Sequence, residues 1–173
     1  MPIIDLEVKL KDCNSREKSH RLKSEFLIEK TSLDELYLLL KFRDPEFNHR
    51  ASWVFNHIIE EKPILLEPYI DDLITWLPNS VSSTQRDTLR SVTKYGVPTK
   101  NEGVWIDICF NFILDPDQAV AVKVHAMEIA FKLTKKHPDL KNELLDVIDQ
   151  FYEVSSYAFQ ARARKIRKGL DSF

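Results

Sequence analysis

Four short segments that repeat at nearly constant spacing constrain the fold more strongly than any other feature of the sequence. HRASWVFNHII, VHAMEIAFKL and ARARKIRKGL superpose on Ala51, Ala126 and Ala163, and the weaker copy QRDTLRSVTKYG places Leu89 at the same position. The steps between these anchor residues are 38, 37 and 37 residues. Apolar residues follow each anchor three, four or seven positions later, which is the spacing of one face of an α-helix. The sequence therefore predicts helical units of about 37–40 residues.

Helical spacing of apolar residues extends over most of the chain and predicts nine helices. Asp44-Pro45 and Asp115-Pro116 each pair a capping acid with a proline that suits a first helical turn, so we expect helices to begin there. Another helix precedes each repeated segment, runs antiparallel to it and has its own apolar face. The predicted helices cover residues 14–29, 32–42, 45–61, 63–77, 83–95, 101–114, 117–137, 139–153 and 156–170.

Glycine is scarce, since the chain of 173 residues contains only Gly96, Gly103 and Gly169. Tight β-turns and phosphate-binding loops need glycine, because they use backbone angles that other residues rarely adopt. This composition disfavours β-sandwiches, dinucleotide-binding folds and P-loops. It is typical of helices joined by proline and polar turns.

Residues 3–10 have a different pattern, in which Ile4, Leu6, Val8 and Leu10 alternate with charged residues as in a β-strand. A strand needs a partner, and no second strand is predicted in the chain. We therefore expect residues 1–13 to form an N-terminal tail or extended lead-in. A strand added to another chain is the alternative.

Three segments resemble a family of short bacterial HEAT-like proteins that are often labelled adenylosuccinate lyase: DPEFNHRASWVFNHIIEEKPILLEPYID, AVAVKVHAMEIAFKLTKKHPDLKNELL and SSYAFQARARKIRK. The resemblance covers roughly residues 30–170. It implies an armadillo-type fold, in which stacked helix pairs complete one another's core. The expected fold class is all-α, a right-handed α-solenoid of about four HEAT-like two-helix repeats plus a leading helix. We expect residues 14–173 to form a single HEAT-like repeat domain.

The lyase label implies residues that this sequence lacks. Enzymes of that class carry a mobile Ser-Ser-x-Met-Pro-x-Lys-x-Asn loop, whose serine removes the proton. Neither Ser82-Ser83 nor Ser155-Ser156 is followed by a Met-Pro element. The five histidines form no His-x-x-x-His or His-x-His pair, and two cysteines are too few for a cysteine-based zinc site. We predict no catalytic residue, no cofactor and no metal site, and we expect a protein that is not an enzyme.

Charge and cysteine content bear on location and partners. The formal charge of −2 gives the whole chain no attraction to nucleic acid or to an anionic membrane. Cys13 and Cys109 are too few for a disulfide framework, and Cys109 lies in an apolar run where a reduced, buried thiol is expected. No secretory signal and no apolar stretch of about 20 residues is present. We expect a cytoplasmic protein that does not bind membranes.

In each helix that contains a repeated segment, one face is predicted to lie away from the core. At 100° per residue, the apolar residues of the helix over 45–61 share one face, and its polar and aromatic residues share the other. The resemblance to HEAT-like stacks places this second face on a concave surface. The same helical phase in the weaker copy also selects Thr88 and Ser91. The predicted ligand-binding surface consists of Arg50, Trp53, His57, Glu60, Tyr95, His125, Glu128, Lys132, Lys135, Arg162 and Lys165.

This predicted surface is basic and partly aromatic. It carries five cations and two acids, so its local charge is about +3 on a chain of net −2. Cations beside Trp53 and Tyr95 suit an acidic peptide, a protein partner or a phosphate-bearing ligand. We expect a non-enzymatic scaffold that binds such a partner. The alternative is a nucleic-acid-binding protein that resembles HEAT-like glycosylases for alkylated purines in DNA, although the near-neutral charge disfavours nucleic acid.

Overall fold

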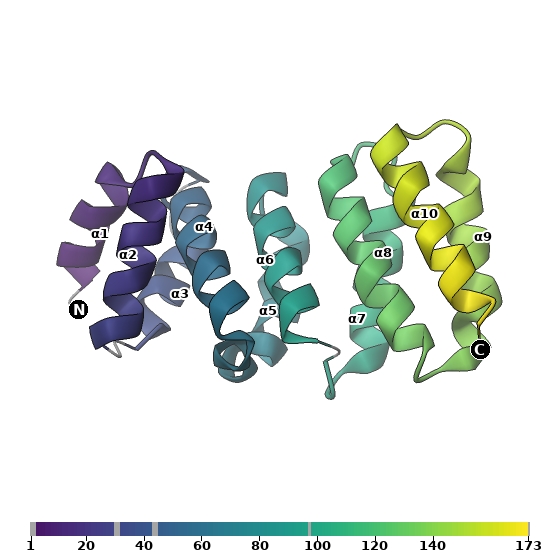
Figure 1. Ribbon diagram of the computed structural model, residues 1–173, viewed down its shortest axis with the longest axis horizontal. Helices are drawn as coiled ribbons and strands as arrows, with labels where there is room; N and C mark the ends of the chain where they lie inside the picture. Colours follow the sequence, from purple (N-terminus) through teal and green to yellow (C-terminus); the bar gives the residue numbers. More distant parts are fainter. Residues whose placement is uncertain (1–2, 30–31, 43–44, 97, 173) are drawn as a thin grey trace. The chain divides into compact units, whose positions relative to one another are not determined.

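The computed structural model describes residues 3–29, 32–42, 45–96 and 98–172, and every regular element in these ranges is a helix (Figure 1). The α-helices are α1 (Ile3–Asp12), α2 (Arg16–Glu29), α3 (Asp34–Phe42), α4 (Pro45–Glu61), α5 (Ile70–Trp76), α6 (Ser82–Tyr95), α7 (Glu102–Leu114), α8 (Val120–Thr134), α9 (Lys141–Tyr152) and α10 (Tyr157–Leu170). The 3-10 helices are η1 (Pro63–Tyr69), η2 (Leu77–Asn79) and η3 (Pro138–Leu140). The prediction of an all-α fold is confirmed.

The helices form two compact units. Unit 1 comprises Met1–Pro68 and Asn79–Tyr95, and unit 2 comprises Tyr69–Pro78 and Gly96–Phe173. In unit 1, α4 packs against α2, α3 and α6, and α2 and α4 lie in front of α3 (Figure 1). In unit 2, α8 packs against α7 and α10, and the layer of α8 and α10 covers α7 and α9. The expectation of a single domain over residues 14–173 stays a prediction.

The four anchor residues of the sequence repeat lie in the cores of these units. Ala51 and Leu89 in unit 1, and Ala126 and Ala163 in unit 2, are all 0% exposed. Three of the four are alanine, whose small side chain allows neighbouring helices to approach closely. The spacing of 37 or 38 residues thus marks the positions at which α4, α6, α8 and α10 contact their neighbours.

A helix occupies the segment that was expected to be an extended lead-in, so that expectation is wrong for residues 3–12. A strand would place Val8 on the same face as Leu6 and Leu10, but Val8 is 62% exposed while both leucines are 0% exposed. Leu6 and Leu10 are four residues apart and therefore also share a helix face. Because α1 packs against α3 and α4, burial of this leucine pair stabilises the helix.

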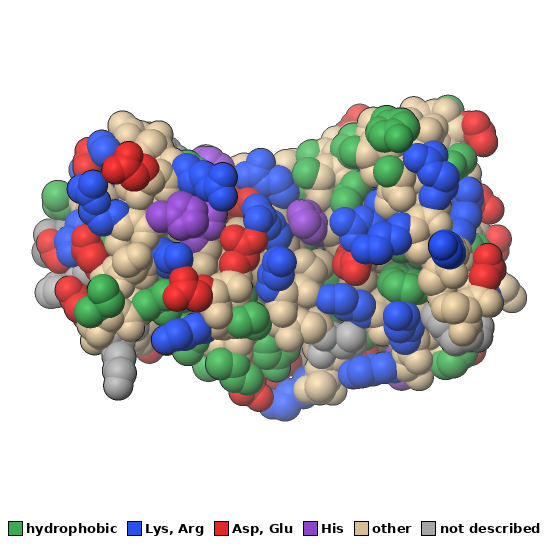
Figure 2. Space-filling view, in the orientation of Figure 1, with side chains coloured by type: hydrophobic (Ala, Val, Ile, Leu, Met, Phe, Trp, Pro, Cys, Tyr) green, Lys and Arg blue, Asp and Glu red, His purple; other side chains and the backbone are tan. Residues whose placement is uncertain are grey.

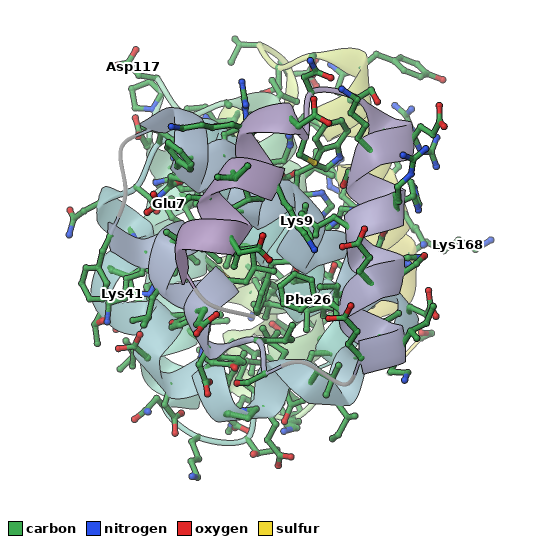
Figure 3. All side chains as sticks on the ribbon, turned by 90° about the vertical axis from the view of Figure 1, so that its left-hand side faces the viewer. Glu7, Lys9, Phe26, Lys41, Asp117 and Lys168 are labelled. Carbon is green, nitrogen blue, oxygen red and sulfur yellow. The ribbon has the colours of Figure 1, made fainter. Side chains whose placement is uncertain are left out.

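The helix that follows α1 is held to it by a polar contact and an apolar side chain. Lys9 of α1 donates a hydrogen bond to Glu25 of α2, with 2.7 Å between Nζ and Oε2. Figure 3 views this end of unit 1, with Lys9 between the two helices and the label of Phe26 beside α2. Phe26 is 2% exposed. These contacts bring α2 into the core of unit 1.

Two helix boundaries differ from the prediction because of proline. The predicted helix over residues 63–77 is divided into η1, α5 and η2. Pro68 lies inside η1, and in an α-helix its ring would clash with the carbonyl group four residues earlier.

Asp115-Pro116 does not begin a helix, because α8 starts at Val120. Asp115 instead ends α7 with an extended backbone, and its Oδ1 accepts a hydrogen bond from the backbone N of Asp117 at 2.9 Å.

Candidate binding surface

The predicted binding residues are divided between the two units. Arg50, Trp53, His57 and Glu60 lie on α4, and Tyr95 ends α6, so these five belong to unit 1. The predicted residues of unit 2 lie on α8, at its carboxyl end and on α10: His125, Glu128, Lys132, Lys135, Arg162 and Lys165. A common binding role for all eleven residues stays a prediction. Each unit has its own distribution of burial and charge.

In unit 1, α2 covers much of the α4 face that was predicted to be open. His57 is 6% exposed, and its ring stacks on His20 of α2 with 4.3 Å between the ring centroids. Arg50 donates hydrogen bonds to the backbone carbonyls of Leu10, at 3.2 Å, and Lys11. Arg50 therefore stabilises the carboxyl end of α1. The expectation that His57 faces away from the protein core is wrong, because helical phase describes one helix and cannot show that α2 packs across it.

Three aromatic side chains of α4 form a row of rings along the helix. His49, Trp53 and His57 are four residues apart, and His20 of α2 continues the row. The centroid distances are 6.5 Å from His49 to Trp53 and 6.0 Å from Trp53 to His57. Figure 2 shows histidine side chains at the surface of this unit. Because the half-buried Trp53 packs between two histidines, the row contributes to the packing of α4 as well as to the surface.

The environment of His57 favours its neutral form. Burial lowers the pKa of His57, the nearby His20 and Arg90 lower it further, and a hydrogen bond with Glu60 opposes this shift. The Nδ1 atom of His57 lies 3.3 Å from Oε2 of Glu60. Arg90 of α6 donates a hydrogen bond to the other carboxylate oxygen of Glu60. Glu60 therefore interacts with both His57 of α4 and Arg90 of α6.

Acidification is expected to destabilise unit 1 through His57. An unfolded histidine binds a proton with a pKa near 6.5, whereas the folded pKa is lower. As pH falls through about 6.5, the unfolded chain binds more protons than the folded chain, so the free energy of unfolding decreases. Urea unfolding at about pH 7 and about pH 5.5 measures this change. His57→Asn should reduce the pH dependence, and an identical dependence in both proteins would contradict the assignment.

The polar residues of α6 mostly face α4 instead of solvent. Thr88 and Ser91, which helical phase assigned to the binding face, are 1% and 0% exposed, so that assignment is wrong. Ser91 Oγ donates a hydrogen bond to Asn56 Oδ1 at 3.2 Å, and Ser52 Oγ donates one to Asp87 Oδ2 at 3.4 Å. A polar seam therefore joins the two helices. It consists of Asn48, Ser52, Asn56, Thr84, Asp87 and Ser91, in which Thr84 also donates a hydrogen bond to Asn48.

Arg86 and Arg90 are the partly exposed cations of α6 that the sequence analysis missed. Arg86 donates two hydrogen bonds to Asp87, from Nε to Oδ1 at 2.9 Å and from Nη2 to Oδ2 at 3.2 Å. Arg90 pairs with Glu60. The polar positions of α4 and α6 recur at spacings of three and four residues, and this pattern is the signal that could have revealed the polar seam between the two helices. Since both arginines contact carboxylates of unit 1, this face offers little charge to a ligand.

Unit 2 carries a basic surface on α8 and α10, which consists of Lys132, Lys135, Arg162, Lys165 and Lys168. Lys132 and Arg162 are half-buried, and the other three residues are exposed. The α10 segment contains five Lys or Arg residues and no Asp or Glu. Figure 2 shows Lys and Arg side chains over both helices. The charge of about +3 predicted for all eleven residues comes entirely from unit 2, because Arg50 and Glu60 cancel in unit 1.

The two helices of the basic surface lie close together. Arg162 of α10 forms an ion pair with Glu128 of α8. Further along, Gly169 of α10 lies against the ring of Phe131, and an added Cβ atom would be 2.5 Å from Cζ of that ring. The same ring lies under a cation, since Nζ of Lys135 is 4.5 Å from its centroid. Cations from both helices therefore belong to one continuous surface.

Neighbouring aromatic rings orient further cations of α10. Arg164 donates a hydrogen bond to Tyr152 Oη at 3.3 Å and lies over the ring of Tyr157, 5.5 Å from its centroid. Arg167 lies 4.1 Å from the ring centroid of Tyr152 and pairs with Asp149. These contacts limit the motion of the two guanidinium groups. They leave the exposed ammonium groups of Lys165 and Lys168 as the more accessible charges of α10.

The described part of the chain holds neither a metal-binding cluster nor a membrane-spanning helix. No group of three or more His, Cys, Asp or Glu side chains in that part is arranged to hold a metal ion. Within the same residues, every helix is too short or too polar to cross a membrane.

Packed helix pairs with buried anchors at a regular spacing define an α-helical repeat protein with a basic surface. The chain belongs to the HEAT repeat domain family, whose model matches residues 6–170. The match begins within α1 and so includes the helix that the sequence analysis took for a lead-in. Searches of curated proteins and of solved structures found no match.

Proposed function

We propose that the protein is a non-enzymatic HEAT-repeat scaffold whose basic surface on α8 and α10 binds an acidic segment of a partner protein. The observation that carries this proposal is the concentration of Lys132, Lys135, Arg162, Lys165 and Lys168 on two adjacent helices of a chain with net charge −2. Carboxylates can accept charge-assisted hydrogen bonds from these side chains. Such bonds are stronger than those between neutral groups.

The dimensions of the surface suit a short peptide. From Arg162 to Lys168, α10 rises about 9 Å at about 1.5 Å per residue, and the axis of a packed neighbouring helix such as α8 lies about 8–10 Å away. An extended peptide spans up to about 3.3–3.6 Å per residue, so about five to six residues cover a path along the cations of α10 and across to those of α8. The contact area is therefore that of a linear acidic segment.

The distribution of charge favours a peptide over duplex DNA. Charges are screened over about 8 Å at physiological ionic strength, so a short segment responds mainly to the basic surface beneath it. A duplex carries a phosphate charge for about every 1.7 Å of its axis and presents charge well beyond one short surface. The net negative charge of the chain opposes such a ligand. The charge distribution therefore favours an acidic peptide over nucleic acid as the ligand.

Fluorescence anisotropy with labelled peptides tests the proposal. A peptide of about six glutamates should bind the full chain at about 50 mM salt and more weakly at about 200 mM, whereas a matched lysine peptide should not bind. Absence of glutamate-peptide binding at the lower salt concentration would contradict the proposal. Tighter binding of a duplex of about 20 base pairs, with affinity falling steeply as salt rises, would support the nucleic-acid alternative instead.

A cytoplasmic location is part of the same proposal. Cys13 and Cys109 are free, buried thiols. Burial raises the pKa of both thiols, which keeps them protonated and slow to react. Buried free thiols are ordinary in proteins of a reducing compartment.

A further inference from the structure

The amino-terminal ends of α8 and α10 carry exposed apolar side chains. Val154, just before α10, is 82% exposed, Tyr157 is 78% exposed and Val120 is 38% exposed. Together with exposed alanines they form an apolar end that consists of Val120, Ala121, Val154, Tyr157, Ala158 and Ala161. Figure 2 shows hydrophobic side chains gathered over these ends of the two helices, with Lys and Arg side chains beyond them. Exposed apolar patches of this kind often mark interaction sites.

The apolar end and the basic surface occupy opposite ends of the same helix pair. Glu128 of α8 contacts Arg162 of α10. Phe131, further along α8, contacts Gly169, which is further along α10. The two helices are therefore parallel, as Figure 1 also shows. Their first turns form the apolar end, and the cations follow from Lys132 in α8 and from Arg162 in α10 toward the carboxyl-terminal ends. From Tyr157 to Arg162, the first cation of α10, the helix rises about 7.5 Å.

We propose that the apolar end and the basic surface form one bipartite site for a partner segment that combines an acidic run with a large apolar side chain. This inference rests on the proposed function and adds the apolar anchor. An extended chain covers about 7.5 Å with about two residues, which sets the spacing between the anchor and the acidic run. The acidic run matches the cations of α8 and α10, and the anchor matches the exposed Val154 and Tyr157.

The position of Tyr157 suits it to hold such an anchor. Its ring lies beneath the guanidinium group of Arg164, 5.5 Å from ring centroid to Cζ. This contact restricts the ring before a partner binds, so less conformational entropy is lost on binding. Exposed tyrosines that become covered are frequent centres of binding energy at protein interfaces. Tyr157 is therefore the residue whose loss should most reduce recognition of the anchor.

Three labelled peptides test the inference on the full chain by fluorescence anisotropy. The first has only the run of about six glutamates, and the other two add a phenylalanine about two residues before or after that run. One anchored peptide should bind about tenfold more tightly than the acidic peptide. The double variant Val154→Ser/Tyr157→Ser should remove that gain and leave binding of the acidic peptide unchanged. Val104→Ser, which changes an exposed valine of α7 in the same unit, should leave all affinities unchanged.

The outcomes separate this inference from the proposed function. If the acidic peptide binds and neither phenylalanine adds affinity, the bipartite site is wrong while the proposed function stands. If the acidic peptide itself does not bind, the proposed function fails. A third arm uses vesicles of phosphatidylserine and phosphatidylcholine. Vesicle binding that exceeds peptide binding and is lost in the Val154/Tyr157 variant would assign the site to a lipid surface and overturn the inference.

Discussion

Replacing Trp105 by alanine is expected to lower the free energy of unfolding by about 3–5 kcal/mol. Trp105 is the largest fully buried side chain of the protein's described residues, at 0% exposure, and lies on α7 in the core of unit 2. Its removal leaves a cavity as well as losing the burial of the indole ring. Urea denaturation monitored by circular dichroism measures the loss of stability, since all the described regular elements are helical.

Trp105→Phe provides the matched control. The indole Nε1 of Trp105 is buried and has no hydrogen-bond partner among the described residues. Phenylalanine fills much of the same space and removes this unsatisfied donor, so it should cost far less stability than alanine. Equal destabilisation by the two substitutions would show that packing of the ring does not explain the role of Trp105.

Reversing two charges of the basic surface is expected to weaken binding of the glutamate peptide about a hundredfold or more. In Lys132→Glu/Lys165→Glu, each substitution removes a charge-assisted contact and introduces repulsion. A hydrogen bond to a charged group contributes about 1.5–3 kcal/mol, which corresponds to about tenfold or more in affinity for each contact. Anisotropy titration at low salt measures the change, and circular dichroism verifies that the variant is folded.

A second double variant separates this local effect from total charge. Lys62→Glu/Lys94→Glu produces the same change in net charge at two exposed lysines of unit 1. It should retain most of the affinity for the glutamate peptide, because the charges of unit 2 are unaltered. If both double variants lose affinity equally, overall charge explains the binding, and the basic surface is not its cause.

Much of the fold could be predicted from the spacing of apolar residues. Ala51, Leu89, Ala126 and Ala163 identified the repeat and are fully buried, because a helix must place its anchors against its neighbours. The α1 helix escaped prediction because a spacing of four residues satisfies both a strand and a helix pattern. Packing of α1 against α3 and α4 decides between them, and local sequence does not contain that information.

The candidate site was predictable only in part. The cations of α10 could be identified from sequence, since no acid interrupts them. His57, by contrast, is covered by α2, Thr88 is buried, and Ser91 belongs to the seam between α4 and α6. Ser91 hydrogen-bonds to Asn56 across the helix interface, so its polarity did not indicate exposure. Residues that depend on the neighbouring helix could not be assigned from the phase of one helix.

Chemical-shift mapping tests most directly the claim that α8 and α10 bind an acidic segment. Isotope-labelled full-length protein is titrated with the glutamate peptide, and backbone amide resonances are followed. The expected result is a set of shifts concentrated at Lys132, Lys135, Arg162, Lys165 and Lys168 and at their neighbours, which decrease as salt is added. Shifts concentrated instead on the ring row of His49, Trp53, His57 and His20, or no shifts at saturating peptide, would contradict it.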